Sequence, residues 1–273
     1  MTYQYFLDTA IAAAHAGGEA LLGMAQQRET LRIETKAESD FVTAADRAAE
    51  ERIVGHILAV FPDHHILAEE QTHATGGRQI AAPETVQWII DPLDGTTNYI
   101  HGVPNFAISI AAKQNGEAVA GVVWDPVRRE LFTASAGGGA FLNGNPIRVS
   151  ASARLRDSLI ATGFPFRVRH LLPSYLRMFN EFMNAARDLR RLGAASLDLA
   201  YVAAGRFDGY WEYSLSPWDF AAGSLLIREA GGMITGFEVD ENFWETGNIL
   251  ASNGKLHPLM REIVLAKENF AKT

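Results

Sequence analysis

Two short apolar segments of the 273-residue chain each run directly into acidic residues. Residues 64–68 are followed by Glu69 and Glu70, and residues 86–90 are followed by Asp91. Both segments are predicted to be short buried strands, and if they are neighbours in a sheet, Glu69 reaches the site of Asp91. Carboxylates that lie together repel one another unless a cation neutralises them, so this pattern predicts a metal site.

The second segment continues into the strongest local signal, residues 91–98, which read DPLDGTTN. Pro92 forces a turn that allows the carboxylates of Asp91 and Asp94 to face one point. Gly95 allows a close approach of the backbone, and residues 96–98 are predicted to begin a helix, whose free N–H groups would bind an anion. Acids beside an anion site require cations between them, which indicates Mg²⁺ that bridges carboxylates and a phosphate. The simpler alternative makes Asp94 a helix N-cap and Asp91 a turn residue.

Two further aspartates stand at expected helix starts. Asp219 follows Trp218 and is either an N-cap, a metal ligand or both. Asp46 follows Thr43 by three residues, a spacing typical of a capping pair, and the alternative is that Asp46 orients a hydroxyl near the metals. The chain has no cysteine and its histidines form no H-x-x-x-H pattern, so an all-oxygen site for Mg²⁺ or Mn²⁺ is favoured over zinc.

The composition narrows the class of protein. The residues are 48% hydrophobic and 21% charged, which is typical of globular proteins. The absence of cysteine excludes a disulfide scaffold and thiolate chemistry. A net charge of −8 argues against nucleic acid as the default ligand. Residues 1–27 lack Lys and Arg and no segment reads as a membrane span, so we expect a cytoplasmic protein without a secretion signal.

The chain is predicted to have two halves with the site between them. Residues 1–152 form an α+β half, with helices at 4–26 and 43–62 and an antiparallel meander at 106–149. Residues 153–273 form an α/β half. In this second half we expect helices at 172–187, 195–204, 218–230 and 256–270, and strands at 158–162, 207–212, 233–237 and 248–252.

These residues together resemble the inositol monophosphatase family of lithium-sensitive, Mg²⁺-dependent phosphatases, in particular its bacterial inositol-1-monophosphatase branch. The matching segments are AEE at 68–70, DPLDGTTN at 91–98 and WDFAAG at 218–223, which runs on to EAGG at 229–232. The resemblance implies an α/β (α+β) fold, a layered α-β-α-β-α sandwich of the inositol monophosphatase/fructose-1,6-bisphosphatase type. It also implies a homodimer.

The resemblance implies two to three Mg²⁺ ions and the residues that bind them. Glu69, Asp91 and the Leu93 carbonyl would hold the first ion. Asp91, Asp94 and Asp219 would hold the second, and Glu69 would help to place a weaker third.

Other residues are implied to bind substrate or to act on water. Gly95 and Thr96 would offer backbone N–H groups to the phosphate. Thr96, paired with Asp46, would help to activate the attacking water near Glu69. Three residues would contact the hydroxyls of a sugar-like ring: Gly193, Ala195 and Glu212. Residues 163–167 and 190–192 vary within the family, so the substrate is less constrained than the reaction.

The implied function is Mg²⁺-dependent hydrolysis of the phosphate monoester of a small polyol, with inositol 1-phosphate as the first choice. Fructose 1,6-bisphosphate, histidinol phosphate and nucleotide phosphates are alternative substrates. An aspartyl-phosphate phosphatase of the haloacid dehalogenase type is disfavoured, because its two acids lie two residues apart whereas Asp91 and Asp94 lie three apart. A regulatory, protein-binding role in transcription on the same fold is a further alternative.

Overall fold

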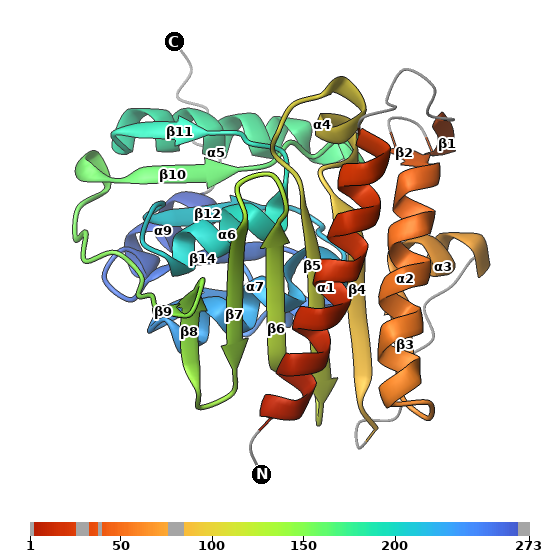
Figure 1. Ribbon diagram of the computed structural model, residues 1–273. Coiled ribbons are helices and arrows are strands. Elements are labelled where there is room, and N and C mark those ends of the chain that lie inside the picture. Colours follow the sequence, from red (N-terminus) through yellow and green to blue (C-terminus); the bar gives the residue numbers. More distant parts are fainter. Residues whose placement is uncertain (1–2, 26–32, 38–39, 76–84, 267–273) are drawn as a thin grey trace.

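The computed structural model describes residues 3–25, 33–37, 40–75 and 85–266 and arranges them in five layers (Figure 1). Helices α1 (Gln4–Ala25) and α2 (Ala44–Val60) lie side by side on one face of a seven-stranded sheet. Helices α6 (Ala195–Ala203) and α7 (Pro217–Glu229) pack between that sheet and a five-stranded sheet. The outer face of the second sheet carries α5 (Leu172–Ala185) and α9 (His257–Leu265). The predicted α-β-α-β-α sandwich is confirmed.

The first sheet has the order β3-β4-β5-β6-β7-β8-β9, in which only β3 and β4 pair in parallel. The antiparallel meander that the sequence predicts forms the rest of this sheet. Its strands are β3 (His65–Ala68), β4 (Gln87–Asp94), β5 (Ala107–Gln114), β6 (Glu117–Asp125), β7 (Glu130–Ser135), β8 (Gly139–Leu142) and β9 (Asn145–Pro146). Three smaller regions accompany it: the strand pair β1 (Ile33–Ala37) and β2 (Asp40–Thr43), helix α3 (Glu69–Thr75) and helix α4 (Thr96–His101).

The second sheet has the order β11-β10-β12-β14-β13, with β10 parallel to both of its neighbours. The four predicted strands form close to their expected positions. Strand β11 was not predicted from sequence, because its three residues, two of them exposed, carry no periodic pattern. The strands are β10 (Leu159–Thr162), β11 (Asp188–Arg190), β12 (Gly209–Glu212), β13 (Gly232–Thr235) and β14 (Ile249–Asn253), and a short helix α8 (Phe243–Thr246) precedes β14.

Strand β4 is buried along its whole length and extends beyond the predicted end at residue 90. Asp91 pairs with Ser109 and Asp94 pairs with Ala107, so two residues of β4 lie opposite one residue of β5. This bulge accommodates Pro92, which has no N–H to give to the ladder. Pro92 therefore bends the strand without ending it, and the bend carries both aspartates.

Two glycines allow α1 to lie close to its neighbours. A Cβ atom on Gly17 would lie 2.8 Å from the side chain of Ile53 on α2, and one on Gly18 would lie 2.6 Å from the indole nitrogen of Trp124 on β6. A larger residue at either position would force these neighbouring side chains to shift, and glycine avoids this. The small residues of α1 thus set the spacing between the first two layers.

The two sheets divide the chain between Pro146 and Leu159, around the expected boundary at residue 152. One hydrophobic cluster joins them, with Val123 from the first sheet, Tyr210 from the second and α6 and α7 between. The division into domains 1–152 and 153–273 stays a prediction. No helix within the described ranges is long and apolar enough to cross a membrane.

Candidate active site

A cavity of about 480 Å³ opens where the two halves meet. On one side its walls come from the end of β4 and the start of α4. On the other they come from residues 163–168, residues 191–198 around the start of α6, the end of β12 and the start of α7. Nearly every site residue predicted from sequence lines this cavity: Glu69, Asp91, Leu93, Asp94, Gly95, Thr96, Gly193, Ala195, Glu212 and Asp219. Asp46 contacts it through Thr96.

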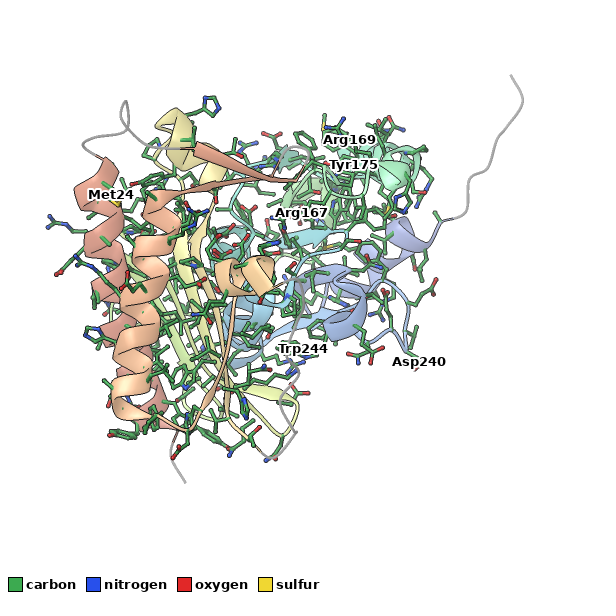
Figure 2. The ribbon with its side chains drawn as sticks, turned by 90° about the vertical axis from the view of Figure 1, so that its right-hand side faces the viewer. Met24, Arg167, Arg169, Tyr175, Asp240 and Trp244 are labelled. Atoms are coloured by element: carbon green, nitrogen blue, oxygen red, sulfur yellow. The ribbon has the colours of Figure 1, made fainter. Side chains whose placement is uncertain are left out.

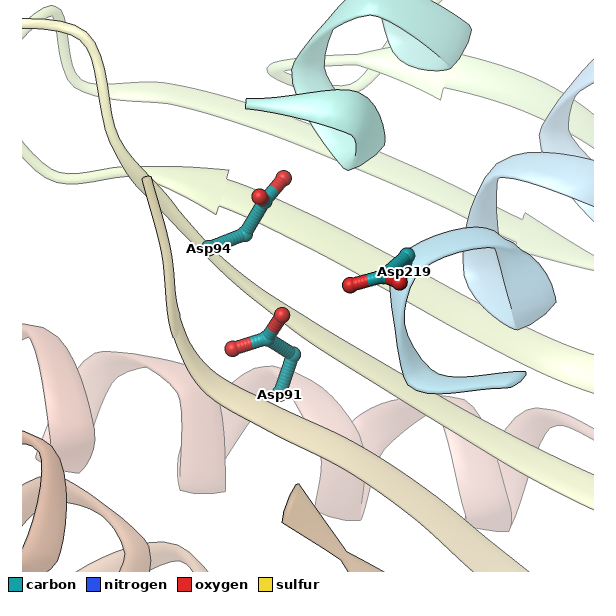
Figure 3. Close-up of side chains that lie close together, drawn as sticks. All are labelled: Asp91, Asp94 and Asp219. Atoms are coloured by element: carbon teal, nitrogen blue, oxygen red, sulfur yellow. The ribbon is translucent and has the colours of Figure 1, made fainter. Parts of the chain in front are cut away.

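Three aspartates converge in the cavity (Figure 3). One carboxylate oxygen each of Asp91, Asp94 and Asp219 lies within 4.8 Å of the others. All three side chains are buried. Asp91 and Asp94 come from the β4 bulge and Asp219 from the first turn of α7, so the bulge and the helix start together build the cluster.

The structure shows that Asp94 is not a helix N-cap. The N-cap of α4 is Gly95, whose φ of +95° favours glycine, and no side chain caps this helix. The carboxylate of Asp94 instead accepts a hydrogen bond from the backbone N–H of Ser196 at 2.7 Å and another from the Ser196 hydroxyl. Asp94 therefore joins β4 to the start of α6, a contact between residues 102 positions apart.

Asp219 caps its helix from the third helical position and not from the N-cap itself. Its Oδ2 accepts a hydrogen bond of 2.7 Å from the backbone N–H of Ser216, which is the N-cap residue of α7. This reciprocal arrangement is a capping box. Capping and a place in the acidic cluster coexist in one carboxylate.

The electrostatics of the cluster explain what it can bind. Burial raises the pKa of Asp91 well above its usual value, and the charges of Glu69, Asp94 and Asp219 raise it further. Burial also raises the pKa of Asp94 and of Asp219, while the charge of Arg167 opposes the shift of Asp219. Crowded, buried carboxylates of this kind are an oxygen donor set that fits a hard divalent cation.

Glu69 lies beside the three aspartates as the first residue of α3. Its Oε1 is 3.7 Å from Nε2 of His73 and 3.8 Å from a guanidinium nitrogen of Arg167. The start of α3 is held by Glu50, whose carboxylate accepts the backbone N–H groups of Glu70 at 2.8 Å and Gln71 at 3.0 Å. The sequence analysis missed Glu50, because a single acid inside a helix carries no signal.

The Thr96 hydroxyl lies within hydrogen-bond distance of two acceptors. Its Oγ1 is 3.2 Å from Oδ1 of the buried Asp46 and 3.0 Å from the carbonyl oxygen of Leu93. The backbone N–H of Leu93 in turn donates to Oδ1 of Asp91 at 3.0 Å. The structure therefore links Asp46, Thr96 and the cluster through one short chain of contacts.

Glu212 lies at the end of β12 and is buried. It accepts a hydrogen bond from the Tyr210 hydroxyl. Burial raises the pKa of Glu212 to about 7, although this hydrogen bond and the charge of Arg191 oppose the shift. A Cβ atom on Gly163 would collide with the Glu212 carboxylate, so the loop that begins there packs directly onto it.

Gly193 and Ala195 frame the start of α6. Gly193 has a φ of +85°, and its carbonyl oxygen accepts the side-chain N–H of Asn98 at 3.3 Å. Ala195 is the first residue of α6. These contacts bring the α6 start against the α4 start, on the same cavity as Glu212.

The basic residues that line the cavity are Arg167 and Arg191 within the described ranges. Figure 2 shows Arg167 in the middle of the molecule, between the long helices of the first half and the elements of the second. The guanidinium carbon of Arg191 lies 4.9 Å from the ring centre of Phe164. The sequence analysis marked both segments as variable and assigned no role to either arginine.

Fold and site together define a class: α-β-α-β-α sandwich proteins with a buried carboxylate site for divalent cations where their two halves meet. The sequence model of the inositol monophosphatase family matches residues 2–268. The chain belongs to the inositol monophosphatase family, as the sequence analysis expected.

Among the similar proteins, some bear the name SuhB and others the name inositol monophosphatase. The Nus factor SuhB of Pseudomonas aeruginosa is 47% identical over 254 residues, which cover 92% of this chain and 93% of the relative. A crystal structure of the extragenic suppressor protein suhB from Bartonella henselae has a TM-score of 0.90 at 39% identity and covers 97% of this chain and 100% of its own. The inositol monophosphatase from Anabaena has a TM-score of 0.84 at 40% identity, with 96% of each chain covered.

Proposed function

We propose that this protein is a Mg²⁺-dependent phosphoric monoester hydrolase that acts on a small phosphorylated polyol, with inositol 1-phosphate as substrate. The observation that carries the proposal is one cavity that holds three buried aspartates, the helix start at Gly95 and the buried Glu212. Family membership supports the phosphatase class, and the Anabaena relative bears the name inositol monophosphatase.

The carboxylates of Glu69, Asp91, Asp94 and Asp219 and the Leu93 carbonyl would hold two to three Mg²⁺ ions. The donor set fits because all of its atoms are oxygens and because the buried carboxylates raise the pKa of Asp91, a repulsion that a divalent cation would relieve. Bound Mg²⁺ supplies Lewis-acid chemistry, which stabilises charge on phosphoryl oxygens and lowers the pKa of a coordinated water.

The residues of the chain would orient the phosphate and the water. Backbone N–H groups of Gly95 and Thr96 at the α4 start would donate to phosphate oxygens. The Thr96 hydroxyl would accept a proton from the attacking water as it gives its own to Asp46, 3.2 Å away. The Leu93 carbonyl, 3.0 Å from Thr96 Oγ1, is the other acceptor within reach, so the single hydroxyl proton must point to Asp46 when it is transferred.

Glu212 would determine substrate specificity by binding the hydroxyls of the polyol. A carboxylate accepts two hydrogen bonds from adjacent ring hydroxyls, and hydrogen bonds to a charged group are worth roughly 1.5–3 kcal/mol. We expect Glu212→Gln to raise KM for inositol 1-phosphate by about 10- to 150-fold and to leave kcat nearly unchanged. Because burial raises the pKa of Glu212 to about 7, the assay belongs at pH 8, where the carboxylate is mostly ionised.

Two controls make the Glu212 prediction specific. p-Nitrophenyl phosphate lacks the ring hydroxyls, so its KM should hardly change in the same variant. Glu229→Gln is the matched substitution away from the cavity, because Glu229 accepts the backbone N–H groups of Gly137 and Gly139 on another face. A loss of equal size on both substrates would assign Glu212 to the support of the whole site.

A phosphate-release screen tests the proposed function directly. Inositol 1-phosphate, fructose 1,6-bisphosphate, histidinol phosphate and a nucleotide phosphate are compared, each with and without Mg²⁺. We expect the highest kcat/KM for inositol 1-phosphate and no turnover without the ion. Turnover without Mg²⁺, or a clear preference for another ester, would contradict the proposal. Lithium sensitivity, the homodimer and the cytoplasmic location stay predictions.

A regulatory role in transcription is a second candidate, because curated relatives up to 47% identical bear the name Nus factor. The intact acidic cluster supports catalysis but does not argue against a second role. The two roles separate when native protein and the Asp91→Asn variant are compared both in the phosphate-release assay and in a pull-down. Partner binding that survives Asp91→Asn while hydrolysis is lost would show a contact role beside catalysis, and binding lost together with hydrolysis would contradict a separate contact role.

A further inference from the structure

Asp198 is a buried acid in α6 that sequence analysis did not single out. Its side chain is 1% exposed, and the residue lines the active-site cavity. Among the residues that the structure describes, no hydrogen-bond partner reaches its Oδ1. Buried polar atoms are almost always hydrogen-bonded in proteins, so an orphaned carboxyl oxygen at a cavity wall requires a reason.

Other buried acids of the chain have donors. Asp94 accepts two hydrogen bonds from Ser196, Asp219 accepts the N–H of Ser216, and Asp125 accepts the N–H groups of Val127 and Arg128. The fold therefore supplies donors to buried acids both inside the metal cluster, as for Asp94 and Asp219, and outside it, as for Asp125. Asp198 differs from them.

The surroundings of Asp198 favour the protonated form of its carboxyl. Burial raises its pKa well above the usual value, the charges of Glu212 and Asp94 raise it further, and the charge of Arg191 opposes them. A neutral carboxyl has one O–H donor and a carbonyl acceptor. A hydroxyl is both donor and acceptor, so it satisfies such a group in either direction.

We propose that Asp198 is a specificity-determining residue that hydrogen-bonds a hydroxyl of the polyol substrate beside Glu212. The proposal rests on the proposed function, because it places a second polar contact in the same polyol site. The contact would be made only when the polyol is bound, which explains why Oδ1 of Asp198 has no hydrogen-bond partner among the described residues.

The structural alternative makes the opposite prediction for stability. A carboxyl that supports the fold should destabilise it when removed. A carboxyl that is hydrogen-bonded only by a ligand is buried without a partner in the free protein, and this lowers the free energy of unfolding. An apolar replacement should therefore stabilise the free protein. Asp198→Leu keeps the number and branching of the side-chain atoms, and Asp198→Asn keeps shape, donor and acceptor.

The experiment measures both variants beside native protein. We expect Asp198→Leu to raise the Tm of the metal-free, substrate-free protein by about 2–4 °C. The same variant should raise KM for inositol 1-phosphate by about 3- to 10-fold and leave KM for p-nitrophenyl phosphate within about twofold. Asp198→Asn should stay within about threefold of native protein on both substrates, because it can still pair with a hydroxyl.

Two results would overturn the proposal: an unchanged KM for inositol 1-phosphate in Asp198→Leu, or an equal loss on both substrates with a lowered Tm. If Asp198→Leu does not fold, Asp198→Ala with the same two substrates replaces it. Failure of the proposed function is recognised separately, because native protein itself would then not hydrolyse inositol 1-phosphate.

Discussion

Asp91→Asn should reduce kcat for phosphate-ester hydrolysis at least about 100-fold at saturating Mg²⁺. The charges of Glu69, Asp94 and Asp219 all act on Asp91, and we propose that Asp91 is shared by two ions. Electrostatic stabilisation by bound metal is worth several kcal/mol, and each 1.36 kcal/mol is a factor of ten in rate. An amide in place of the carboxylate weakens both ion sites at once.

The same substitution should stabilise the metal-free protein. Burial and three neighbouring carboxylates raise the pKa of Asp91 in the folded state above its unfolded value. At low pH both states hold the proton and the cost is absent. As the pH rises through the unfolded value, the unfolded state ionises first, so the folded state loses stability until its own raised pKa is passed. The Tm gain of Asp91→Asn should therefore be larger at pH 7 than near pH 4.

Asp125→Asn is the matched control for Asp91→Asn. Asp125 is also fully buried, but it lies outside the cavity and pairs with Arg128 at 2.7 Å. We expect it to lower Tm and to keep kcat. Thermal unfolding without metal and a steady-state assay with Mg²⁺ check both variants. An Asp91→Asn variant with more than a few per cent of native kcat would remove Asp91 from its shared position.

Most helices and strands and the three aspartates could be predicted from sequence because each depends on local signals, whereas the layered α-β-α-β-α arrangement was implied by the resemblance to the family. Asp91 and Asp94 share one eight-residue segment, and Asp219 follows Pro217 at a helix start. What the signals misjudged was the local role of these acids. Asp94 was considered as a possible helix N-cap, but it accepts a hydrogen bond from Ser196 at the start of α6. Pro92 was expected to end the strand, but it lies in a bulge within β4.

The residues that sequence missed depend on contacts between distant segments. Glu50 holds the start of α3 from α2, 20 residues earlier in the chain, and Ser196 holds Asp94 from 102 residues later. Asp198 becomes conspicuous only in the packed structure, where no described residue donates a hydrogen bond to its buried Oδ1. An isolated acid or serine in a helical pattern has no periodicity or spacing that marks it, so only the packed structure reveals it.

Thr96→Ala should lower kcat for inositol 1-phosphate by about 100-fold with little change in KM. The hydroxyl of Thr96 is 3.2 Å from Oδ1 of Asp46, and we propose that this pair takes the proton of the attacking water. Proton transfer of this kind contributes typically about 10²- to 10⁴-fold, and it acts in the transition state. The backbone N–H of residue 96 survives the substitution, so binding of the phosphate group should persist.

Thr97→Ala is the matched control for Thr96→Ala, because it removes the same hydroxyl one residue later, from an exposed side chain in the same helical turn. It should keep kcat within a few-fold of native protein. Asp46→Asn tests the partner: if Thr96 passes its proton to Asp46, the amide should lower kcat as Thr96→Ala does, and the double variant should lose little more than either single one. A change confined to KM, or losses that multiply in the double variant, would mean that the two residues do not act as one proton-accepting pair.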